Sequence, residues 1–335
     1  MISQIVYLFL SFIVTALLGK IIIPILKKLK VGQSERLDGP RAHLKKQGTP
    51  TMGGIMMIIS IILFVSVYSI LSRDLTEIIP ILGVSIASLG FGIVGFIDDF
   101  KKVVLKNTDG LNPKLKMLGL LIISVIYTMF LLKYVGIGTD IFIPLINYHL
   151  VLPIWIFIPF TIFVMLGSTN AVNLTDGVDG LAGSVSSIMI TAISIIAIKL
   201  NYTSISIFGA IVVGACLGFL IYNFYKAKVM MGDTGSLLLG GVISSMTIYM
   251  KLSLLLIIIA IVPIIETFSV ILQVLYFRKT GKRLFRMSPL HHHFELSGWR
   301  ENKVVAVFSL ITFISSTCAI LLIWDYMFIF DNIFK

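Results

Sequence analysis

Apolar runs of about twenty residues recur along almost the whole chain, and they constrain its fold more than any other feature. About 20 consecutive apolar residues in a helix cross a bilayer core. Of the 335 residues, 57% are hydrophobic and only 13% are charged, whereas a soluble domain carries about 25% charged residues. The chain is therefore predicted to be an all-α integral membrane protein, and residues 1–335 are expected to form a single polytopic domain.

The apolar runs predict ten transmembrane helices. They cover residues 4–26, 51–71, 78–97, 117–135, 151–168, 181–200, 204–224, 236–250, 253–276 and 303–324. No basic residue precedes the first run, so it is interpreted as a retained span and not as a cleavable signal peptide. Cys216 and Cys318 lie inside apolar runs, so neither a disulfide framework nor a cysteine metal site is predicted.

Basic residues gather on one predicted side of the bundle. This side contains the loops that follow the first, third, fifth, seventh and ninth spans. The other side carries only Arg73, Lys133, Lys199, Lys251 and Lys335. The positive-inside rule makes the basic side cytoplasmic and places both termini outside. With a formal net charge of +11, such a face also attracts anionic lipids and phosphate-bearing substrates. Nucleic acid is not an expected partner, because the basic residues are dispersed at the ends of the spans.

Two adjacent carboxylates, Asp98 and Asp99, end the third apolar run. A charge at the bilayer centre costs about 2.5–3.5 kcal/mol, so both are expected at the membrane edge. Neighbouring carboxylates repel each other, which raises one pKa unless a cation lies between them. An acidic helix end in water explains this pair equally well by itself. A functional site is favoured because three other segments bring Asp, Asn, Gly and His to the same predicted face.

The third cytoplasmic loop, residues 167–183, is polar and rich in glycine. Asn170, Asn173 and Asp176 are spaced by three, so one helical turn would align them, and Asp179 continues the series. Amides and carboxylates can hold sugar hydroxyls, a nucleobase edge or a hydrated cation. A solvated turn is the alternative interpretation.

The fourth and fifth cytoplasmic loops also carry polar motifs. In Met-Gly-Asp-Thr-Gly-Ser, residues 231–236, helix capping explains Thr234 and Ser236, but it does not explain Asp233 between two glycines. In Pro-Leu-His-His-His-Phe-Glu, residues 289–295, the side chains of adjacent histidines diverge. Phosphate binding or proton transfer therefore fits them better than a closed zinc site.

Three other segments give weaker signals. Lys-Lys-Gln-Gly-Thr-Pro-Thr-Met-Gly-Gly, residues 45–54, opens a helix whose free N–H groups suit an anion, although tight glycine packing is an equally simple explanation. The β-branched segment 136–150 predicts a small hairpin. Glu266 follows Pro263 inside the ninth span. It is either a functional intramembrane acid or a buried glutamate bonded to a neighbouring helix.

These motifs occur in a characteristic order, from the 45–54 segment through Gly-Phe-Ile-Asp-Asp-Phe to the histidine run. In combination they closely resemble the phospho-N-acetylmuramoyl-pentapeptide-transferase family, which belongs to the polyprenyl-phosphate N-acetylhexosamine-1-phosphate transferases. The resemblance covers nearly the whole chain. It implies ten transmembrane helices in the bacterial cytoplasmic membrane, usually as a homodimer, with the active site at the cytoplasmic face.

The resemblance also implies a reaction. Phospho-MurNAc-pentapeptide moves from UDP-MurNAc-pentapeptide to undecaprenyl phosphate, giving lipid I and UMP in the first membrane step of peptidoglycan synthesis. Mg²⁺ is the implied cofactor. Because two phosphate-bearing substrates repel each other, such a reaction needs a cation and positioning more than covalent help. Direct attack and an Asp-bound phosphosugar intermediate both remain open at this point.

Position by position, the resemblance assigns roles to matching residues. The implied catalytic residues are Asp98, Asp99, Asp233 and His291, of which the three aspartates are the magnesium site and Asp98 deprotonates or orients the lipid phosphate. The implied substrate-binding residues are Lys46, Asp179 and Asn223 for the nucleoside, His292 and His293 for phosphate or sugar, and Thr51, Asn170, Asn173, Asp176, Gly232, Ser236 and Gln273 for the rest of the cleft. Met230 stands where the family pattern has an aromatic residue, so a thioether replaces a stacking ring.

Two other functions compete with this interpretation. A transferase of the same superfamily could act on another sugar, for example UDP-N-acetylglucosamine, but the histidine run and the Gly-Thr-Pro-Thr-Met-Gly-Gly segment favour the muramoyl-pentapeptide substrate. A secondary transporter built around Glu266 would need acids near mid-membrane and internal repeats. The acids gather at one face instead, and no repeat is seen.

Overall fold

The computed structural model describes residues 2–29, 48–103 and 110–333, with side chains up to residue 324. The predicted site residue Lys46 lies outside the described residues. In chain order the elements are α1 (Ile2–Lys28), α2 (Gly54–Ser72), α3 (Leu75–Val103), α4 (Pro113–Phe130), the π-helical turn η2 (Leu131–Val135), β1 (Asp140–Ile143), β2 (Tyr148–Val151), α5 (Ile154–Thr175), α6 (Leu181–Lys199), α7 (Thr203–Asn223), α8 (Gly232–Tyr249), the 3₁₀ turn η3 (Ser253–Leu255), α9 (Leu256–Ile259), α10 (Ile261–Thr280), α11 (Leu290–Leu296) and α12 (Glu301–Ile333).

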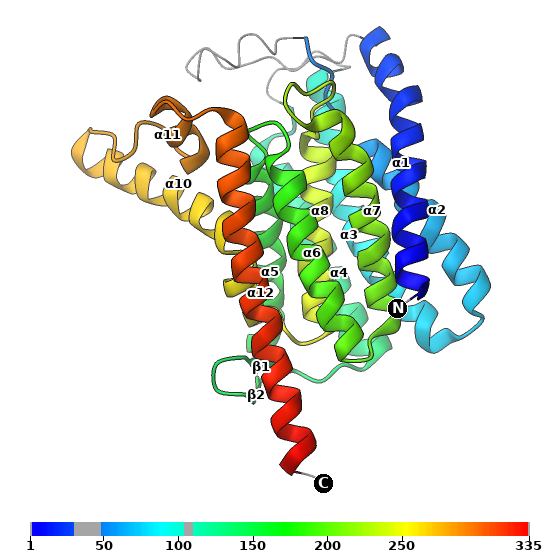
Figure 1. Ribbon diagram of the computed structural model, residues 1–335. Helices are drawn as coiled ribbons and strands as arrows, with labels where there is room; N and C mark the ends of the chain where they lie inside the picture. The colour runs from blue at the N-terminus through cyan, green and yellow to red at the C-terminus, as the bar shows by residue number, and fades with distance from the viewer. Residues whose placement is uncertain (1, 30–47, 104–109, 334–335) are drawn as a thin grey trace.

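Most of the helices form one upright bundle (Figure 1). Within the described residues, nine helices are long and apolar enough to cross a membrane, which confirms the all-α membrane prediction. The eighth predicted span, 236–250, forms α8, which is not among the nine. Its residues from Thr234 to Ile248 are all buried. Because α8 lies inside the bundle against α3 and α5, it needs little of the apolar surface that lipid-facing helices present.

The packing of α3 against α8 positions the acidic residues. Gly95 allows this close approach, because a Cβ atom there would collide with the backbone carbonyl of Asp233. The last turns of α3 therefore lie beside the first turn of α8. Asp98, Asp99 and Lys102 therefore share one end of the bundle with Asp233, which lies 131 or more positions later in the chain. We call this end the site end.

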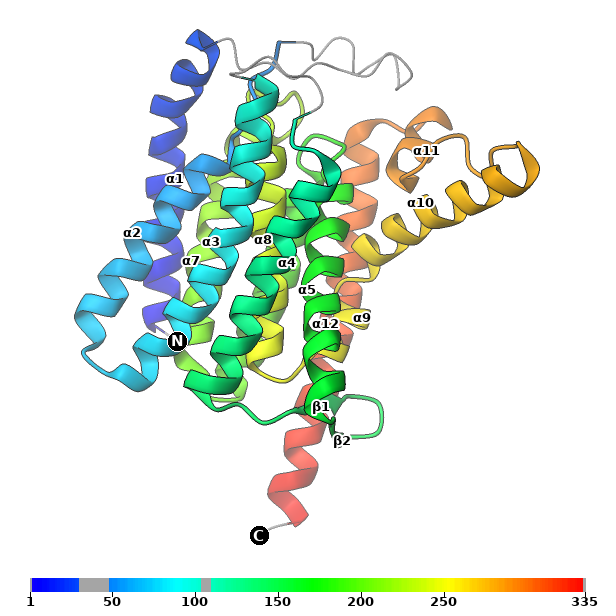
Figure 2. The same cartoon turned by 180° about the vertical axis from the view of Figure 1, so that it is seen from behind.

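The predicted ninth span, 253–276, is not one continuous helix. It is divided into η3, α9 and α10, with a break at Ala260. Pro263 lies in the first turn of α10, where the missing N–H breaks no helical hydrogen bond. Figures 1 and 2 show that α10 leaves the bundle and extends away from it, with α11 beside it near the site end.

The predicted hairpin at 136–150 is confirmed. Strands β1 and β2 pair antiparallel, with Asp140 opposite Val151 and Ile143 opposite Tyr148. The hairpin lies at the end of the bundle opposite the site end (Figure 2). A hydrogen bond from Phe142 N to Lys251 O (2.9 Å) and an ion pair between Asp140 and Lys251 fasten it to the turn after α8.

Candidate active site

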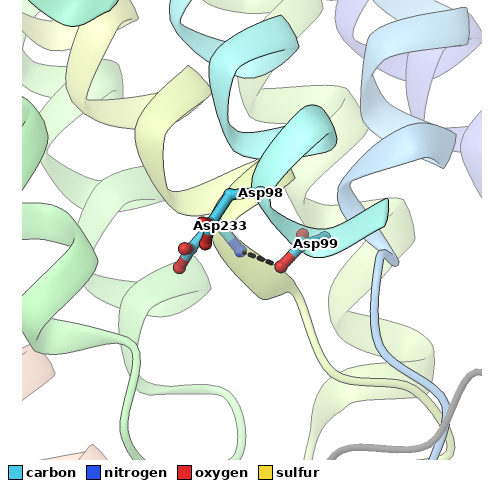
Figure 3. Close-up of side chains that lie close together, drawn as sticks. All are labelled: Asp98, Asp99 and Asp233. Atoms are coloured by element: carbon cyan, nitrogen blue, oxygen red, sulfur yellow. Dashed lines mark hydrogen bonds between the residues drawn. The ribbon is translucent and has the colours of Figure 1, made fainter. Parts of the chain in front are cut away.

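Three carboxylates converge at the site end, as Figure 3 shows. Asp98 and Asp99 come from the end of α3, and Asp233 comes from the first turn of α8. One oxygen of each lies within 4.8 Å of the others. Asp98 and Asp99 are only 2% and 4% exposed. We call Asp98, Asp99 and Asp233 the carboxylate cluster, and it can hold a metal ion.

Asp99 stabilises the start of α8. Its Oδ1 accepts a hydrogen bond from Asp233 N (3.2 Å), and its Oδ2 accepts from Thr234 N (2.9 Å) and Thr234 Oγ1 (2.7 Å). The first N–H groups of a helix lack partners within the helix, so a carboxylate from α3 satisfies them here. Gly232, at φ +73°, leaves room for this contact, because a Cβ atom there would lie 2.5 Å from Asp99 Oδ2.

The prediction that Thr234 and Ser236 cap their own helix is wrong. Thr234 donates its hydroxyl to Asp99, and Ser236 Oγ donates to the Gly232 carbonyl oxygen (3.1 Å). Neither hydroxyl accepts a hydrogen bond from a free N–H of α8. The nearby Asp99 carboxylate takes this role because a negative charge suits the partial positive charge of a helix N-terminus better than a neutral hydroxyl.

Asp98 is held on both sides of its carboxylate. Oδ1 accepts a hydrogen bond from Leu111 N (2.7 Å), and Oδ2 lies 2.5 Å from Lys102 Nζ and 3.7 Å from Lys116 Nζ. Lys102 follows Asp98 by one turn on α3, whereas Lys116 comes from the first turn of α4. Two ammonium groups therefore compensate the charge of a nearly buried carboxylate.

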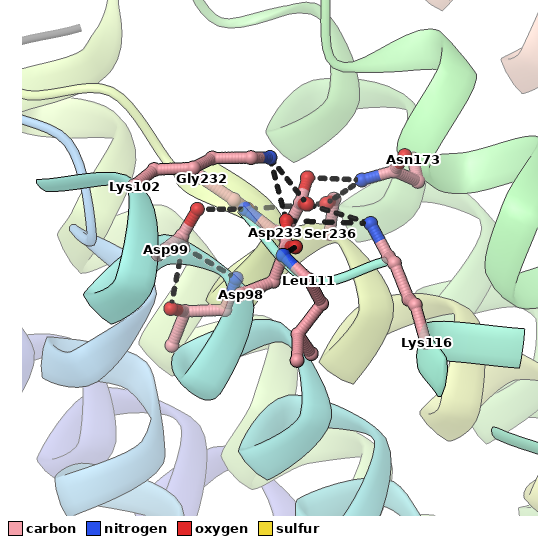
Figure 4. Close-up of polar contacts among 10 residues, drawn as sticks. Asp98, Asp99, Lys102, Leu111, Lys116, Asn173, Gly232, Asp233 and Ser236 are labelled. Carbon is pink, nitrogen blue, oxygen red and sulfur yellow. Dashed lines mark hydrogen bonds and ion pairs between the residues drawn. The ribbon is translucent and has the colours of Figure 1, made fainter. Parts of the chain in front are cut away.

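Asp233 shares the same two lysines, as Figure 4 shows. Its Oδ2 lies 2.6 Å from Lys116 Nζ and 3.2 Å from Lys102 Nζ, and its Oδ1 accepts a hydrogen bond from Asn173 Nδ2 (2.7 Å). The amide of Asn173 also reaches Ser236 Oγ (2.9 Å). The carboxylate oxygens of the cluster are ligands that a hard divalent cation prefers, and the Asn173 amide holds one of them through its N–H group.

The polar segment 167–183, which the sequence predicts as a loop, is helical up to Thr175 at the end of α5, and it only partly follows the predicted alignment. Asn173 reaches the carboxylate cluster, but Asn170 Nδ2 donates to the Leu166 carbonyl oxygen of its own helix (2.7 Å). Asp176 lies at the C-terminal end of α5. Burial of its carboxyl group, followed by the charges of Asp233, Asp99 and Asp179, raises the pKa of Asp176 to about 8.

Asp179 and Asn223 join two loops at the site end. Asp179 Oδ2 accepts a hydrogen bond from Ala227 N (3.0 Å). Asn223 accepts from Gly180 N and donates to the Val229 carbonyl oxygen, both at 3.0 Å. Asp179 also lines an open groove of about 590 Å³ between α6, α7 and α12. These contacts organise the region in which the sequence predicts the nucleoside site.

The segment before α2 reaches the same region. Met230 N donates to the Pro50 carbonyl oxygen (2.7 Å), and Gly53 N donates to the Met230 carbonyl oxygen (2.9 Å). Thr51 is buried, and its Oγ1 lies on the side of Gly232 where a Cβ atom would be. The predicted helix start is found at Gly54.

The histidine run forms α11, and its three rings have different environments. His291 is fully buried and its backbone N donates to Glu266 Oε1 (3.1 Å). His292 Nδ1 lies 2.8 Å from Glu295 Oε2, and His293 Nδ1 accepts a hydrogen bond from Arg286 N (3.1 Å). Gln273 accepts from Leu284 N and Phe285 N (3.0 and 2.8 Å), so it braces the loop between α10 and α11.

Sequence reasoning did not identify Lys102 and Lys116 as members of the site. Lys102 could have been found, because it follows Asp98 at the i+4 spacing that places two side chains on one helix face. Lys116 gives no such signal, since 117 positions separate it from Asp233. Only the packing of α4 beside α3 brings its ammonium group to the carboxylate cluster.

The chain is similar to known proteins over most of its length. The model of glycosyl transferase family 4 matches residues 81–251. A phospho-N-acetylmuramoyl-pentapeptide-transferase of Halalkalibacterium halodurans is 48% identical over 95% of this chain and 97% of its own length. Proteins of the same name from Acetivibrio thermocellus and Bacillus subtilis are 46% and 47% identical, over 93% and 89% of this chain and 93% and 91% of their own lengths.

Proposed function

This chain belongs to the phospho-N-acetylmuramoyl-pentapeptide-transferase family, and from that membership we propose the reaction and the role of each site residue. The protein is a phosphoglycosyl transferase that makes lipid I. An oxygen of undecaprenyl phosphate attacks the β-phosphorus of UDP-MurNAc-pentapeptide. The bond from that phosphorus to the bridging oxygen breaks, and UMP leaves. The observation that carries this conclusion is the near-complete alignment with relatives of that name.

The carboxylate cluster is the proposed Mg²⁺ site. Asp233 is the first ligand, with Asp98 and Asp99 beside it, and three oxygens within 4.8 Å of one another support this assignment. Bound Mg²⁺ would neutralise phosphate charge and so reduce the repulsion between the two substrates. The nearby ammonium groups of Lys102 and Lys116 are placed to bind phosphate oxygens of the same substrates.

Different contacts support different roles for Asp98 and Asp99. Both oxygens of Asp99 accept hydrogen bonds from the start of α8, so Asp99 fixes the geometry of the cluster. Oδ2 of Asp98 is contacted by the ammonium groups of two partly exposed lysines, Lys102 and Lys116. Asp98 is therefore the better candidate to orient the attacking lipid phosphate or to accept its proton.

The remaining binding residues follow the family positions. We propose that Lys46, Asp179 and Asn223 bind the nucleoside and that His291, His292 and His293 serve the phosphates or the sugar. The rest of the cleft is formed by Thr51, Asn170, Asn173, Asp176, Gly232, Ser236 and Gln273. In this chain the side chains of Asn170, Gln273 and His293 form hydrogen bonds with backbone groups and so hold the surrounding segments in place.

The reaction is tested with purified protein in detergent, undecaprenyl phosphate and UDP-MurNAc-pentapeptide. UMP release is measured with Mg²⁺ and again with EDTA, and the lipid product is identified by mass. Mg²⁺-dependent UMP with a lipid-linked product is expected. Turnover of UDP-N-acetylglucosamine in place of the muramoyl substrate would contradict the proposed specificity.

We also propose that the protein is a single domain of the bacterial cytoplasmic membrane, with the site end facing the cytoplasm and both termini outside. The excess of Lys and Arg in the loops at that end supports this orientation. Labelling of single cysteines introduced at Lys114 and Arg73 tests it, because the two positions should react from opposite sides. The family resemblance further suggests a homodimer, which the mass of the protein in detergent would test.

A further inference from the structure

A second pair of buried titratable side chains lies away from the carboxylate cluster. Glu266 of α10 and His291 of α11 are each only 1% exposed, and Glu266 Oε1 lies 3.4 Å from His291 Nδ1. The same oxygen accepts the hydrogen bond from the His291 backbone N–H. Among the described residues, no hydrogen-bond partner is found for Glu266 Oε2 or for either ring nitrogen of His291. Buried polar atoms without partners are uncommon unless they serve a function.

The opposite edge of the His291 ring is also constrained. It faces Gly177, where a Cβ atom would collide with Nε2. Gly177 follows Asn173 by four residues, and Asn173 donates its amide to Asp233. The imidazole is therefore held between Glu266 and the loop that follows α5, the helix whose Asn173 reaches the carboxylate cluster.

This arrangement has a chemical consequence for the ring. A carboxylate beside Nδ1 favours a proton on that nitrogen, either in the neutral tautomer or in the imidazolium ion. In the neutral tautomer Nε2 can then accept a hydrogen bond or a proton, and in the imidazolium ion it can donate one, in each case on the Gly177 side. The His292 ring, with its centroid 4.2 Å from that of His291, restricts rotation of the imidazole further.

We propose that Glu266 is a positioning residue for the transfer reaction. It holds the imidazole of His291 with Nδ1 toward the carboxylate and Nε2 toward the substrate phosphates, and it anchors the start of α11 through the backbone N–H. The proposal rests on the transferase function. Orienting the His291 ring is a role for Glu266, the intramembrane acid of α10, that differs from transport and from lipid contact.

The main test is the Glu266→Gln variant, which preserves side-chain size and an oxygen that can accept the His291 N–H but removes the charge. We expect kcat to fall about 10- to 100-fold, which is less than the loss expected when a general acid or base itself is removed. KM for UDP-MurNAc-pentapeptide should stay within about threefold. Adding His291→Ala should cause no loss beyond that of His291→Ala alone, because Glu266 acts through that ring. Glu77→Gln, at the opposite end of the bundle beside Tyr68, is the matched control and should keep wild-type turnover.

Several results would overturn the proposal. Unchanged kcat in a folded Glu266→Gln protein would do so, as would losses that multiply in the double variant. A measurement on the unaltered protein covers a variant that does not fold: ¹⁵N NMR of histidine-labelled protein should show a proton on His291 Nδ1, and an unprotonated Nδ1 would contradict the assignment. Wild-type protein that releases no UMP would refute the transferase function and with it the role of Glu266 in transfer, whereas the NMR result would still decide whether Glu266 orients the His291 ring.

Discussion

The carboxylate cluster and the Glu266–His291 pair bury negative charge in two different ways. In the cluster, three carboxylates share two ammonium groups and the first N–H groups of α8. In the pair, one carboxylate faces one imidazole and accepts one backbone N–H. A buried charge is costly unless it is paired. The cluster meets this requirement with cations that can be exchanged, and the pair meets it with a single fixed partner.

Exposure separates the two regions further. The side chains of Lys102, Lys116 and Asp233 are 39%, 21% and 17% exposed, whereas Glu266 and His291 are each 1% exposed. A metal ion and charged substrates can therefore reach the cluster and displace the lysines. The buried pair can act on a substrate only through the edge of one ring. We infer that the cluster exchanges its cations during turnover and that the pair keeps its geometry.

The largest expected effect is that of Asp233→Asn. It removes a proposed metal ligand and leaves the ammonium groups of Lys102 and Lys116 with less compensating charge. Turnover should fall about 10³-fold, the size expected when one preorganised charged group is lost, while thermal unfolding shows a folded protein. UMP release over a range of Mg²⁺ concentrations is the measurement. Wild-type-like turnover would remove Asp233 from the metal assignment.

Lys116→Met tests whether the cations of the cluster are exchangeable. The substitution removes an ammonium group that competes with a metal ion for Asp233 Oδ2, so half-maximal activity should need less Mg²⁺. At saturating Mg²⁺, kcat should still fall about 10-fold or more, because a phosphate-binding charge is lost. Unchanged dependence on Mg²⁺ would show that Lys116 does not compete with the metal.

Thr234→Val tests the contact between α3 and α8 without changing a charge. The hydroxyl donated to Asp99 is lost, and the free energy of unfolding should fall by about 1–2 kcal/mol. Thr247→Val is the matched control on the same helix, because Thr247 Oγ1 bonds only carbonyl oxygens of α8. Thermal unfolding should rank the first variant below the second. Equal stability would show that Asp99 does not depend on the Thr234 hydroxyl.

The smallest expected effect concerns Asp176 and pH. Burial raises the pKa of Asp176 to about 8 in the folded protein, above the ordinary value of an aspartate, so folding favours the protonated carboxyl. The stability contributed by Asp176 is present at low pH and is lost as pH rises toward 8. In EDTA, Tm should fall between pH 6 and pH 8 by roughly a few degrees more in the wild type than in Asp176→Asn. Parallel curves would contradict this.

Sequence reasoning succeeded where local patterns were strong. The apolar runs located the membrane helices, and the β-branched residues located the hairpin at 136–150. It failed at the start of α8, where capping by Thr234 was expected and Asp99 is the residue that accepts the N–H groups. It also drew residues 253–276 as one span and did not predict the break at Ala260, because hydropathy reports nothing about helix direction.

The sequence alone determined that the protein is a helical membrane protein and that most of its predicted site residues lie at or near the ends of membrane helices. Both follow from the cost of placing charge in a bilayer, which is a property of each segment by itself. The tertiary structure decided which of those groups meet. Asp99 reaches α8, Lys116 reaches Asp233, and Glu266 reaches His291. These contacts depend on the close packing of helices that are far apart in the chain, and no local periodicity encodes that packing.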